Sequence, residues 1–542
     1  MSAPFDRPRP LPDALTARWE SSGAWSAVTA SEVVGQPAGA DATACVVDGL
    51  HYTFGTLTQW SSAVAAVLHQ HGVRRGDRVL IQLPNTAELI TAILASWRLG
   101  AIAVPVLPLL REHELCAVIQ QTAPAAVIAG SISAARTASD EIDNALSQAA
   151  IKPLVRISAA PCSVGWMPFP GHTAVHGQRV APQQGLANAG ACALVLFTSG
   201  TTAGPKGVRH DSRSLLAEVN SYRRSAGLTA NDVIFNPAPI AHIGALVISV
   251  LVPWCVGAPV VLLSKWDSQR ACDVIARERV TFAVGAPYFL NELVTLYESG
   301  DFGAHRLSRF QTGAAPTSAT LLARAERVGI AGWRAWGMTE APSISYAMPD
   351  DSLDRRANFD GRVEPGSEVV AVDDRGAVLA PGREGHLLVR TPKQMMGYLR
   401  DVEGLITAGG WLATGDVGAV DVDGWVRITG RLKDIINRGG EKFSAREIED
   451  ALCEHPAIDA AAVLAVPEQR LGEQVVAYVT LSQGQCYPGF TALTDHLRSR
   501  RMAPQKYPVT ITVLETLPMT ATGKVHKHAL AQLWQRSQPT AT

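Results

Sequence analysis

The sequence has few features of a secreted, metal-binding or nucleic-acid-binding protein. Its 542 residues include 8 cysteines, with no CxxC pair and no Cys/His cluster at zinc spacing, so neither a disulfide framework nor a zinc site is expected. Lys and Arg number 48 against 49 Asp and Glu, a balance that favours neither nucleic acid nor an acidic membrane surface. The pattern predicts buried thiols in a reducing compartment and no nucleic-acid partner.

Export and membrane insertion are not expected either. The start, MSAPFDRPRPLPDAL, carries prolines and charges where a signal peptide has an apolar core, so we expect a cytoplasmic protein. Residues 243–263 lack charge and are long enough to span a bilayer. Pro253, Gly257 and Pro259 interrupt this stretch, which predicts an apolar helix at 243–252 and a buried strand at 260–263 instead of a transmembrane segment.

An α/β rhythm runs through the first two thirds of the chain. Residues 78–83 have the pattern of a strand, 87–99 that of a helix and 101–106 that of a second strand. We therefore predict mostly parallel sheets wrapped by helices. Further apolar strand-like runs occupy residues 125–129, 193–197, 233–236, 260–263 and 282–284.

The pattern of apolar runs and turns in the sequence changes twice towards the C-terminus. After Arg362, short runs at 367–372 and 386–390 are separated by Asp-Arg-Gly and Pro-Gly turns, which predicts a small antiparallel β subdomain. After Gly430 we expect a compact α+β unit with two helices, at 444–453 and 487–500. Residues 137–185 are expected to be loop-rich and exposed.

The strongest local signal is an apolar strand that leads into hydroxyls, glycines and one lysine. Glycine lets backbone N–H groups converge on phosphate oxygens, and hydroxyls and an ammonium group add donors. A Walker loop is excluded because Pro205 follows Gly204 and Gly207 follows Lys206. A flexible Gly/Thr hairpin is the alternative. The predicted phosphate-binding residues are Thr198, Ser199, Gly200, Thr201, Thr202 and Lys206.

This loop, TSGTTAGPKG, resembles the TSGTTGxPKG signature of the adenylate-forming superfamily of acyl-CoA synthetases, luciferases and nonribosomal peptide adenylation domains. Ala203 stands where the family often has glycine, and further motifs follow in family order. The resemblance implies a ligase that uses ATP and Mg²⁺ to make an acyl-adenylate and then transfers the acyl group to coenzyme A.

Two further segments resemble nucleotide-binding motifs of this family. The run Trp336-Gly337-Met338-Thr339-Glu340 looks like YGMTE, which implies an aromatic ring beside adenine, Thr339 at the α-phosphate and Glu340 as the Mg²⁺ ligand. A carboxylate suits this hard cation, which retains phosphates and waters as its other ligands. Gly313, Ala314 and Ala315 resemble the segment that cradles adenine and borders the acyl pocket.

The remaining motifs imply a mobile C-terminal domain. Asp416 and Arg431 match family residues that contact the ribose or a phosphate, and Lys524 matches the lysine that enters the site during adenylation. An ammonium group there would reduce repulsion between the carboxylate and the α-phosphate. Lys433, within the hinge 431–434, would allow rotation between domains 1–430 and 435–542.

The resemblance also places the two organic substrates. After rotation, Gly440 would border the pantetheine tunnel and Lys442 could contact coenzyme A phosphates. His242 would gate entry of the acid, although a histidine satisfied by backbone is an equal alternative. The other predicted pocket residues, mainly small or apolar, are Ile243, Ala245, Gly285, Gly313, Gly337 and Met338.

The sequence leaves the acid and the acceptor open. No acidic residue lies between Asp232 and Asp267 to bind an α-ammonium group, so we expect a hydrophobic acid, whether linear, aromatic or bulky and alicyclic. A carrier-protein phosphopantetheine is the alternative acceptor. A non-catalytic nucleotide- or acyl-binding protein and a luciferase-like oxygenase are further alternatives, and a homodimer is expected by analogy with the family.

Overall fold

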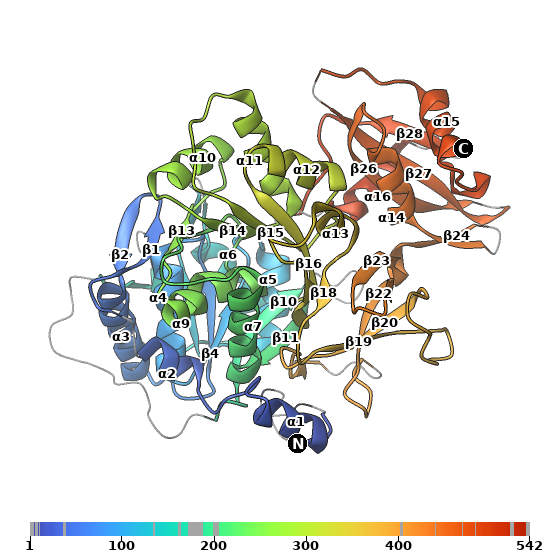
Figure 1. The fold of residues 1–542 in the computed structure, drawn as a ribbon. Helices are drawn as coiled ribbons and strands as arrows, with labels where there is room; N and C mark the ends of the chain where they lie inside the picture. The colour runs from blue at the N-terminus through green and yellow to red at the C-terminus, as the bar shows by residue number, and fades with distance from the viewer. Residues whose placement is uncertain are drawn as a thin grey trace.

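A computed structural model gives the fold of the chain (Figure 1). The structure describes residues 5, 9, 11–35, 39–133, 136–160, 164–171, 188–198, 205–400, 405–438, 441–468, 470–482, 484–520 and 525–537. Within these ranges the strands form two large sheets, a small antiparallel sheet and a C-terminal sheet, besides a two-stranded ribbon of β6 (Ser131–Ser133) and β7 (Arg136–Thr137).

The first large sheet has the strand order β18-β17-β16-β15-β14-β12-β13-β1-β2. From β16 to β1 all neighbours are parallel, and the outer pairs are antiparallel. The strands are β1 (Thr43–Val47), β2 (Leu50–Thr53), β12 (Ile234–Asn236), β13 (Val260–Leu262), β14 (Phe282–Gly285), β15 (Arg309–Thr312), β16 (Ala331–Met338), β17 (Ala341–Tyr346) and β18 (Arg362–Val363).

The second large sheet has the order β21-β11-β10-β4-β3-β5-β8-β9. It is parallel from β10 to β9, while β11 pairs antiparallel with both β10 and β21. The strands are β3 (Arg78–Gln82), β4 (Ile102–Pro105), β5 (Ala126–Ala129), β8 (Val155–Ser158), β9 (Met167–Pro168), β10 (Cys192–Thr198), β11 (Lys206–Asp211) and β21 (Gly397–Tyr398).

Helices cover both sheets and fill the space between them. Their bounds in the large unit are α1 (Asp13–Ser21), α2 (Ala30–Gly35), α3 (Phe54–Gln70), α4 (Ala87–Arg98), α5 (Glu112–Thr122), α6 (Ser139–Gln148), α7 (Ser212–Ser225), α8 (Ile243–Leu246), η2 (Val247–Leu251), α9 (Val252–Val256), α10 (Ser268–Arg277), α11 (Pro287–Ser299), α12 (Ala319–Arg327) and α13 (Leu353–Asn358).

The period of two along each strand builds this layering. In β3, Val79 and Ile81 join a core shared with α3, α4 and the first sheet, whereas Leu80 joins the core beneath α5 and α6. In β13, Val260 faces the shared core and Val261 faces the core beneath α10 and α11. Successive side chains point to opposite faces of a strand, so an unbroken apolar run is what a strand between two helical layers requires.

The C-terminal half adds two smaller sheets. The antiparallel sheet, ordered β19-β20-β22-β23, contains β19 (Glu368–Val372), β20 (Gly385–Arg390), β22 (Leu412–Val420) and β23 (Val426–Arg431). After η3 (Leu432–Asp434), the last sheet joins β24 (Ile435–Arg438), β25 (Glu441–Ser444), β26 (Ile458–Glu468), β27 (Gly472–Leu481) and β28 (Thr510–Val513), packed with α14 (Ala445–Cys453), α15 (Phe490–Ser499), η4 (Pro504–Lys506) and α16 (Lys527–Ser537).

The predicted α/β architecture, the antiparallel subdomain and the α+β C-terminal unit are confirmed. Three details were wrong. The region 137–185 contains α6 and β8, because Ile142, Ala145 and Leu146 give α6 a buried apolar face. The C-terminal unit has α16 as a further helix. The thiol of Cys486 is exposed, although the described cysteines are all free of disulfides.

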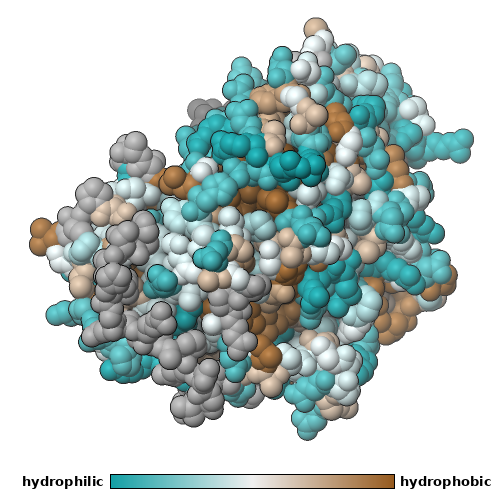
Figure 2. All heavy atoms as spheres, turned by 60° about the vertical axis from the view of Figure 1, so that its left-hand side comes forward, coloured by the Kyte–Doolittle hydropathy of each residue, from teal (hydrophilic) through white to brown (hydrophobic). Residues whose placement is uncertain are grey.

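The protein's described helices include none that is both long and apolar enough to cross a bilayer. The uncharged stretch instead forms α8, η2 and α9, followed by β13, close to the predicted division. On the face shown in Figure 2, hydrophobic residues form small separate patches among hydrophilic ones.

Candidate active site

The predicted adenine and acyl residues gather at one edge of the first large sheet. Strands β12, β14, β15 and β16 are parallel neighbours, so their carboxyl ends lie on the same edge. His242 precedes α8 after β12, Gly285 ends β14, and Gly313 follows β15. The backbone N–H of Gly313 donates to the carbonyl of Gly285 at 3.1 Å. Ligands of open α/β sheets bind at such an edge.

Close backbone packing explains the small residues at this edge. A Cβ on Gly337 would lie 2.5 Å from the backbone N of Ser343, and one on Gly285 would lie 3.0 Å from both Phe289 and Pro237. Ala314 has a φ of 67°, a left-handed conformation that alanine rarely adopts. Close packing within the protein therefore accounts for Gly337 and Gly285, whereas Ala314 is notable for its unusual backbone conformation.

The predicted phosphate loop connects β10 and β11, whose end residues Thr198 and Lys206 lie opposite each other. On the C-terminal side, the carbonyl of Pro205 accepts a 2.9 Å hydrogen bond from Gln121 Nε2. The structure thus brings the ends of the loop together. The predicted residues Ser199, Gly200, Thr201 and Thr202 lie outside the described residues.

Lys206 and Glu340 both lie close to Tyr398. The Lys206 Nζ lies 5.2 Å from the centre of the Tyr398 ring, and the Tyr398 hydroxyl donates to Glu340 Oε1 at 2.5 Å. Glu340 is 6% exposed and Tyr398 8%. Burial, together with the neighbouring Glu340 carboxylate, raises the pKa of the Tyr398 phenol, so the hydroxyl remains a donor at neutral pH.

A buried histidine supports the neighbouring threonine. The His210 Nε2 lies 2.8 Å from the carbonyl of Thr339, and its Nδ1 lies 3.1 Å from Ser214 Oγ. Burial lowers the pKa of His210 to about 4, so the ring is neutral at pH 7. A neutral ring has one N–H, and a carbonyl only accepts; Nε2 therefore carries the proton and donates to Thr339.

The segment after Glu340 rests on a buried charge cluster. Lys393 is fully buried and bonds to the carboxylate of Glu364 and to the carbonyl of Ser343. It lies 3.8 Å from Glu218, which accepts a 2.5 Å hydrogen bond from Ser343 Oγ. Burial lowers the pKa of Lys393 to about 7. The cluster joins α7 to the strand that follows Glu340.

The predicted nucleotide-binding residues Trp336, Asp416 and Arg431 also contact one another. Trp336 Nε1 donates to Asp416 Oδ2 at 2.8 Å, and Arg431 Nε donates to Asp416 Oδ1. Asp416 is 4% exposed, whereas half of the Arg431 side chain is exposed. Burial alone would lower the pKa of Arg431, but Asp416 and the more distant Asp434 and Glu340 raise it, so the guanidinium stays charged.

This arrangement suits a polyphosphate nucleotide. The Lys206 ammonium group lies at the base of the loop, and the Arg431 guanidinium is directed at a buried carboxylate beside an indole. Glu340 could hold a divalent cation through Oε2, because the hydrogen bond from Tyr398 goes to Oε1. The same residues contain no group of three or more His, Cys, Asp or Glu placed to bind a metal, so phosphates and waters would complete such a shell.

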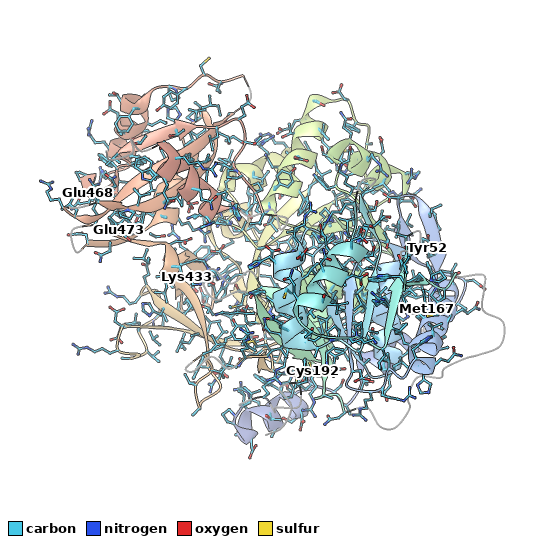
Figure 3. All side chains as sticks on the ribbon, turned by 180° about the vertical axis from the view of Figure 1, so that it is seen from behind. Tyr52, Met167, Cys192, Lys433, Glu468 and Glu473 are labelled. Atoms are coloured by element: carbon cyan, nitrogen blue, oxygen red, sulfur yellow. The ribbon has the colours of Figure 1, made fainter. Side chains whose placement is uncertain are left out.

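Several predicted residues are not brought into the site by the described structure. Gly440 and Lys524 lie outside the described residues, and the Lys442 side chain does too. Lys433 lies in the exposed helix η3 between the small antiparallel sheet and the C-terminal unit (Figure 3). Its neighbour Asp434 forms a 3.3 Å ion pair with Lys527.

His242 is half-buried and directly precedes α8. Its N–H donates to the carbonyl of Pro239 at 3.1 Å, and its own carbonyl accepts from Leu246. The neighbouring pocket candidates Ile243 and Ala245 are buried, and Met338 is half-buried at the end of β16. The backbone of His242 is thus fixed at the sheet edge.

The sequence-based prediction missed Tyr398 and His210. His210 had a usable signal, because Lys206, Val208 and His210 alternate along β11 and therefore share a face. Tyr398 had none, because its proximity to Glu340 depends on the pairing of β21 with β11.

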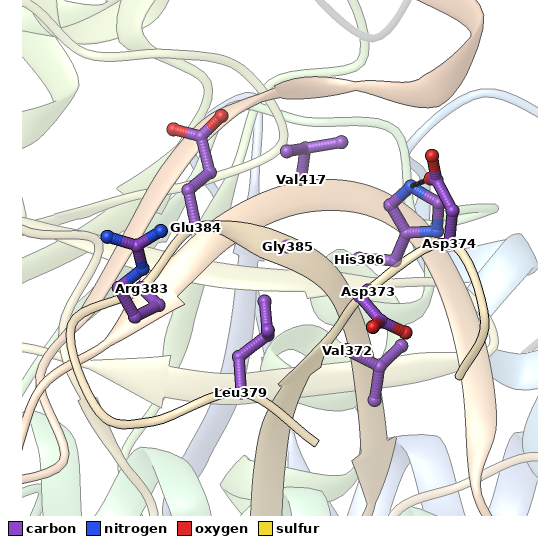
Figure 4. Close-up of a pocket in the computed structure, with 9 residues that line it drawn as sticks. All are labelled: Val372, Asp373, Asp374, Leu379, Arg383, Glu384, Gly385, His386 and Val417. Carbon is purple, nitrogen blue, oxygen red and sulfur yellow. Dashed lines mark ion pairs between the residues drawn. The ribbon is translucent and has the colours of Figure 1, made fainter. Parts of the chain in front are cut away.

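A surface pocket of about 330 Å³ lies elsewhere, on the small antiparallel sheet (Figure 4). Its lining includes His386, whose Nε2 lies 3.2 Å from Asp374 Oδ1. Val417 also lines it, whereas the preceding Asp416 points to the opposite face of β22. Asp373 accepts from two backbone N–H groups of its own turn. The pocket contains none of the predicted site residues.

Two family profiles match the chain. The profile described as AMP-binding enzyme matches residues 34–399, and the AMP-binding enzyme C-terminal domain matches residues 447–524. The predicted residues Asp416, Arg431 and Lys433 lie between the two matched ranges.

The chain is similar over most of its length to proteins named as CoA ligases. It is 32% identical to the medium-chain fatty-acid–CoA ligase of Escherichia coli K12, over 95% of this chain and 92% of that protein. It is also 30% identical to a ligase of Rhodococcus jostii RHA1, over 90% of this chain and 95% of that protein. That relative is named 3-[(3aS,4S,7aS)-7a-methyl-1,5-dioxo-octahydro-1H-inden-4-yl]propanoyl:CoA ligase. The solved structure of the amide bond synthetase McbA from Marinactinospora thermotolerans matches with a TM-score of 0.82 and 28% identity. The match covers 93% of this chain and 99% of McbA.

Proposed function

Because this chain belongs to the family of AMP-binding enzymes, we propose that it activates a hydrophobic carboxylic acid with ATP and transfers the acyl group to coenzyme A. The first step gives an acyl-adenylate and pyrophosphate, and the second gives the acyl-CoA and AMP. The chain is thus an AMP-forming acid–thiol ligase of the adenylate-forming superfamily.

One observation carries the proposal. Lys206 and Glu340, which are 134 positions apart, lie on the ring and the hydroxyl of one tyrosine beside the ends of the β10–β11 loop. A cation and a buried carboxylate held at a glycine- and hydroxyl-rich loop suit the β- and γ-phosphates and their counter-ion.

In the first step, a carboxylate oxygen of the acid attacks the α-phosphorus of ATP. The new bond joins that oxygen to phosphorus, the bond to the α,β-bridging oxygen breaks, and pyrophosphate leaves with its electrons. Thr339 orients the α-phosphate, since its carbonyl is fixed by His210. Lys524 joins the site during this step and reduces the repulsion between the two anions.

Binding of the nucleoside uses the Asp416 group. Asp416 accepts from the ribose hydroxyls, and Arg431, already paired with it, contacts the ribose or a phosphate. The Trp336 indole and the Gly313–Ala315 turn border the adenine. Mg²⁺, held by Glu340 and the phosphates, would neutralise negative charge on the triphosphate.

In the second step the thiol sulfur of coenzyme A attacks the acyl carbonyl. The carbon–sulfur bond forms, the bond to the AMP phosphate oxygen breaks, and the thiol proton leaves to solvent. Residues 435–542 rotate about Lys433, so that Lys524 is withdrawn and Gly440 borders the pantetheine. Lys442 contacts a coenzyme A phosphate. The exposed position of η3 between two sheets supports this hinge.

The acid binds between His242 and the edge formed by Gly285, Gly313 and Gly337. His242 gates its entry, and Ile243, Ala245 and Met338 line the pocket. The E. coli relative is named for medium-chain fatty acids and the Rhodococcus relative for a propanoyl group on an octahydroindene ring. These names support a hydrophobic acid without an α-amine, and we favour a bulky alicyclic ring over a short linear chain.

The test supplies ATP, Mg²⁺ and a panel of linear, aromatic and fused-ring acids, with and without coenzyme A, and follows pyrophosphate, AMP and thioester. We expect pyrophosphate release with a hydrophobic acid and thioester only when coenzyme A is present. An adenylate that persists until a phosphopantetheine carrier protein is added would identify carrier loading instead. Absence of pyrophosphate with every acid would contradict catalysis, and activity confined to short linear acids would contradict the ring preference.

A further inference from the structure

We propose that Tyr398 is a positioning residue that holds Glu340 with its hydroxyl and Lys206 with its ring, and so keeps both groups apart and ready for the nucleotide. This inference rests on the proposed function. It concerns a residue outside the motifs that suggested that function.

The backbone of Tyr398 is fixed by the strand that carries Lys206. Val208 of β11 lies opposite Tyr398 of β21, and the N–H of Leu399 donates to the carbonyl of Gly207 at 2.8 Å. A Cβ on Gly207 would lie 2.6 Å from Leu399 Cδ1 and 3.2 Å from Phe197 Cε1. Glycine at this position therefore leaves room for the Leu399 side chain, and the pairing of β21 with β11 places the Tyr398 ring beside the Lys206 ammonium group.

The hydroxyl group fixes one carboxylate oxygen. A carboxylate only accepts hydrogen bonds, so the phenol donates to Glu340 Oε1 at 2.5 Å. On the other side of the residue, the carbonyl of Glu340 accepts from the N–H of Met395 at 2.8 Å. Backbone and side chain of Glu340 are both held by the segment 395–398, which leaves Oε2 for a cation.

The ring keeps two opposite charges from pairing. Lys206 and Glu340 both contact Tyr398, yet the ion pairs formed within the described part of the chain do not join these two residues. A direct ion pair would occupy the groups that the phosphates and their counter-ion need. The face of an aromatic ring attracts an ammonium group without neutralising it, so Lys206 remains available.

Two substitutions separate the two contacts. Tyr398→Phe keeps the ring and removes the hydroxyl, whereas Tyr398→Leu removes both. Binding is measured with α,β-methylene-ATP, which cannot release pyrophosphate, by calorimetry without metal and by electron paramagnetic resonance with Mn²⁺. Tyr487→Phe, at a 37% exposed tyrosine of the C-terminal unit, is the matched control, and thermal unfolding verifies that each variant is folded.

Tyr398→Phe is expected to weaken Mn²⁺ binding to the enzyme–nucleotide complex by about tenfold, the loss typical of a hydrogen bond to a charged group, and to leave metal-free nucleotide affinity unchanged. Tyr398→Leu is expected to weaken both. The inference would be overturned if Tyr398→Phe bound Mn²⁺ as tightly as the wild type. It would also be overturned if Tyr398→Phe and Tyr398→Leu lost equal affinity for Mn²⁺ and equal affinity for the metal-free nucleotide. Pyrophosphate release by the wild-type enzyme tests the proposed function separately.

Discussion

The indole Nε1 of Trp336 donates a 2.8 Å hydrogen bond to Oδ2 of Asp416, across 80 positions of sequence. The bond joins the end of β16 in the first large sheet to β22 of the small antiparallel sheet. Because Arg431 binds the other oxygen of the same carboxylate, the proposed nucleoside site depends on contacts between two sheets.

Trp336→Phe should therefore weaken ATP binding while keeping an aromatic ring beside the adenine. Loss of a hydrogen bond to a buried carboxylate is expected to raise the KM for ATP by about tenfold, with little effect on thioester formation from supplied adenylate. Initial rates of pyrophosphate release over a range of ATP concentrations measure the change. Asp416→Asn, which removes the shared charge, should cause a larger loss, and the reverse order would contradict the assignment of Asp416.

Lys524→Ala should abolish adenylation and largely spare the second step. In the proposed mechanism the ammonium group is needed only while the acid approaches the α-phosphate, since coenzyme A attacks an adenylate already formed. Pyrophosphate release and thioester formation from synthetic acyl-adenylate are measured in parallel. Lys527→Ala, a lysine paired with Asp434 and Glu449 in the same unit, provides the comparison. Equal loss of both half-reactions in Lys524→Ala would show that this residue is not specific to adenylation.

His210 should make the fold less stable in mild acid. Its pKa is lowered from 6.5 to about 4, by burial and by Arg9, against the opposing effects of its bond to Thr339 and of Asp211. Above pH 6.5 the ring is neutral in both states; as the pH falls towards 4, only the unfolded chain binds the proton readily. Stability is therefore lost on acidification, by about 3 kcal/mol over this window.

The comparison for this prediction is His210→Gln, whose Nε2 can still donate to Thr339 but does not titrate. Melting temperatures at about pH 7.5 and about pH 5 should differ less in this variant than in the wild type. Identical differences would mean that His210 is not the group responsible. If the variant melts at a much lower temperature at both pH values, the difference between its two melting temperatures still decides the question.

Lys393→Met should destabilise the large unit. The substitution leaves Glu218 and Glu364 buried without the cation between them, and loss of one partner of a buried ion pair costs about 3–5 kcal/mol. Urea unfolding followed by tryptophan fluorescence measures the effect. Lys265→Met, at an exposed lysine, should change stability by less than about 0.5 kcal/mol. A similar small change in both variants would contradict a stabilising role for Lys393.

The fold was predictable from sequence where one strand or helix carries its own pattern. The apolar runs that became β3, β4, β5 and β10 were recognisable from their length, their apolar composition and the adjoining helices. Helix α6 was missed because its apolar face is formed by three separated residues, Ile142, Ala145 and Leu146, in an otherwise polar segment. The missed α16 has one fully buried apolar side chain, Leu530, so its pattern was weak.

The sequence by itself determined which chemical groups are present and in what local order: the loop ending in Lys206, the Trp336–Glu340 run, and Asp416 before Arg431. Each of these groups lies within a short stretch of sequence, and the resemblance of each stretch to a family motif implied its role. Only the tertiary structure decided how they meet. Tyr398 reaches Glu340, His210 reaches Thr339 and Trp336 reaches Asp416 through strand register and burial, which depend on packing between segments far apart in sequence.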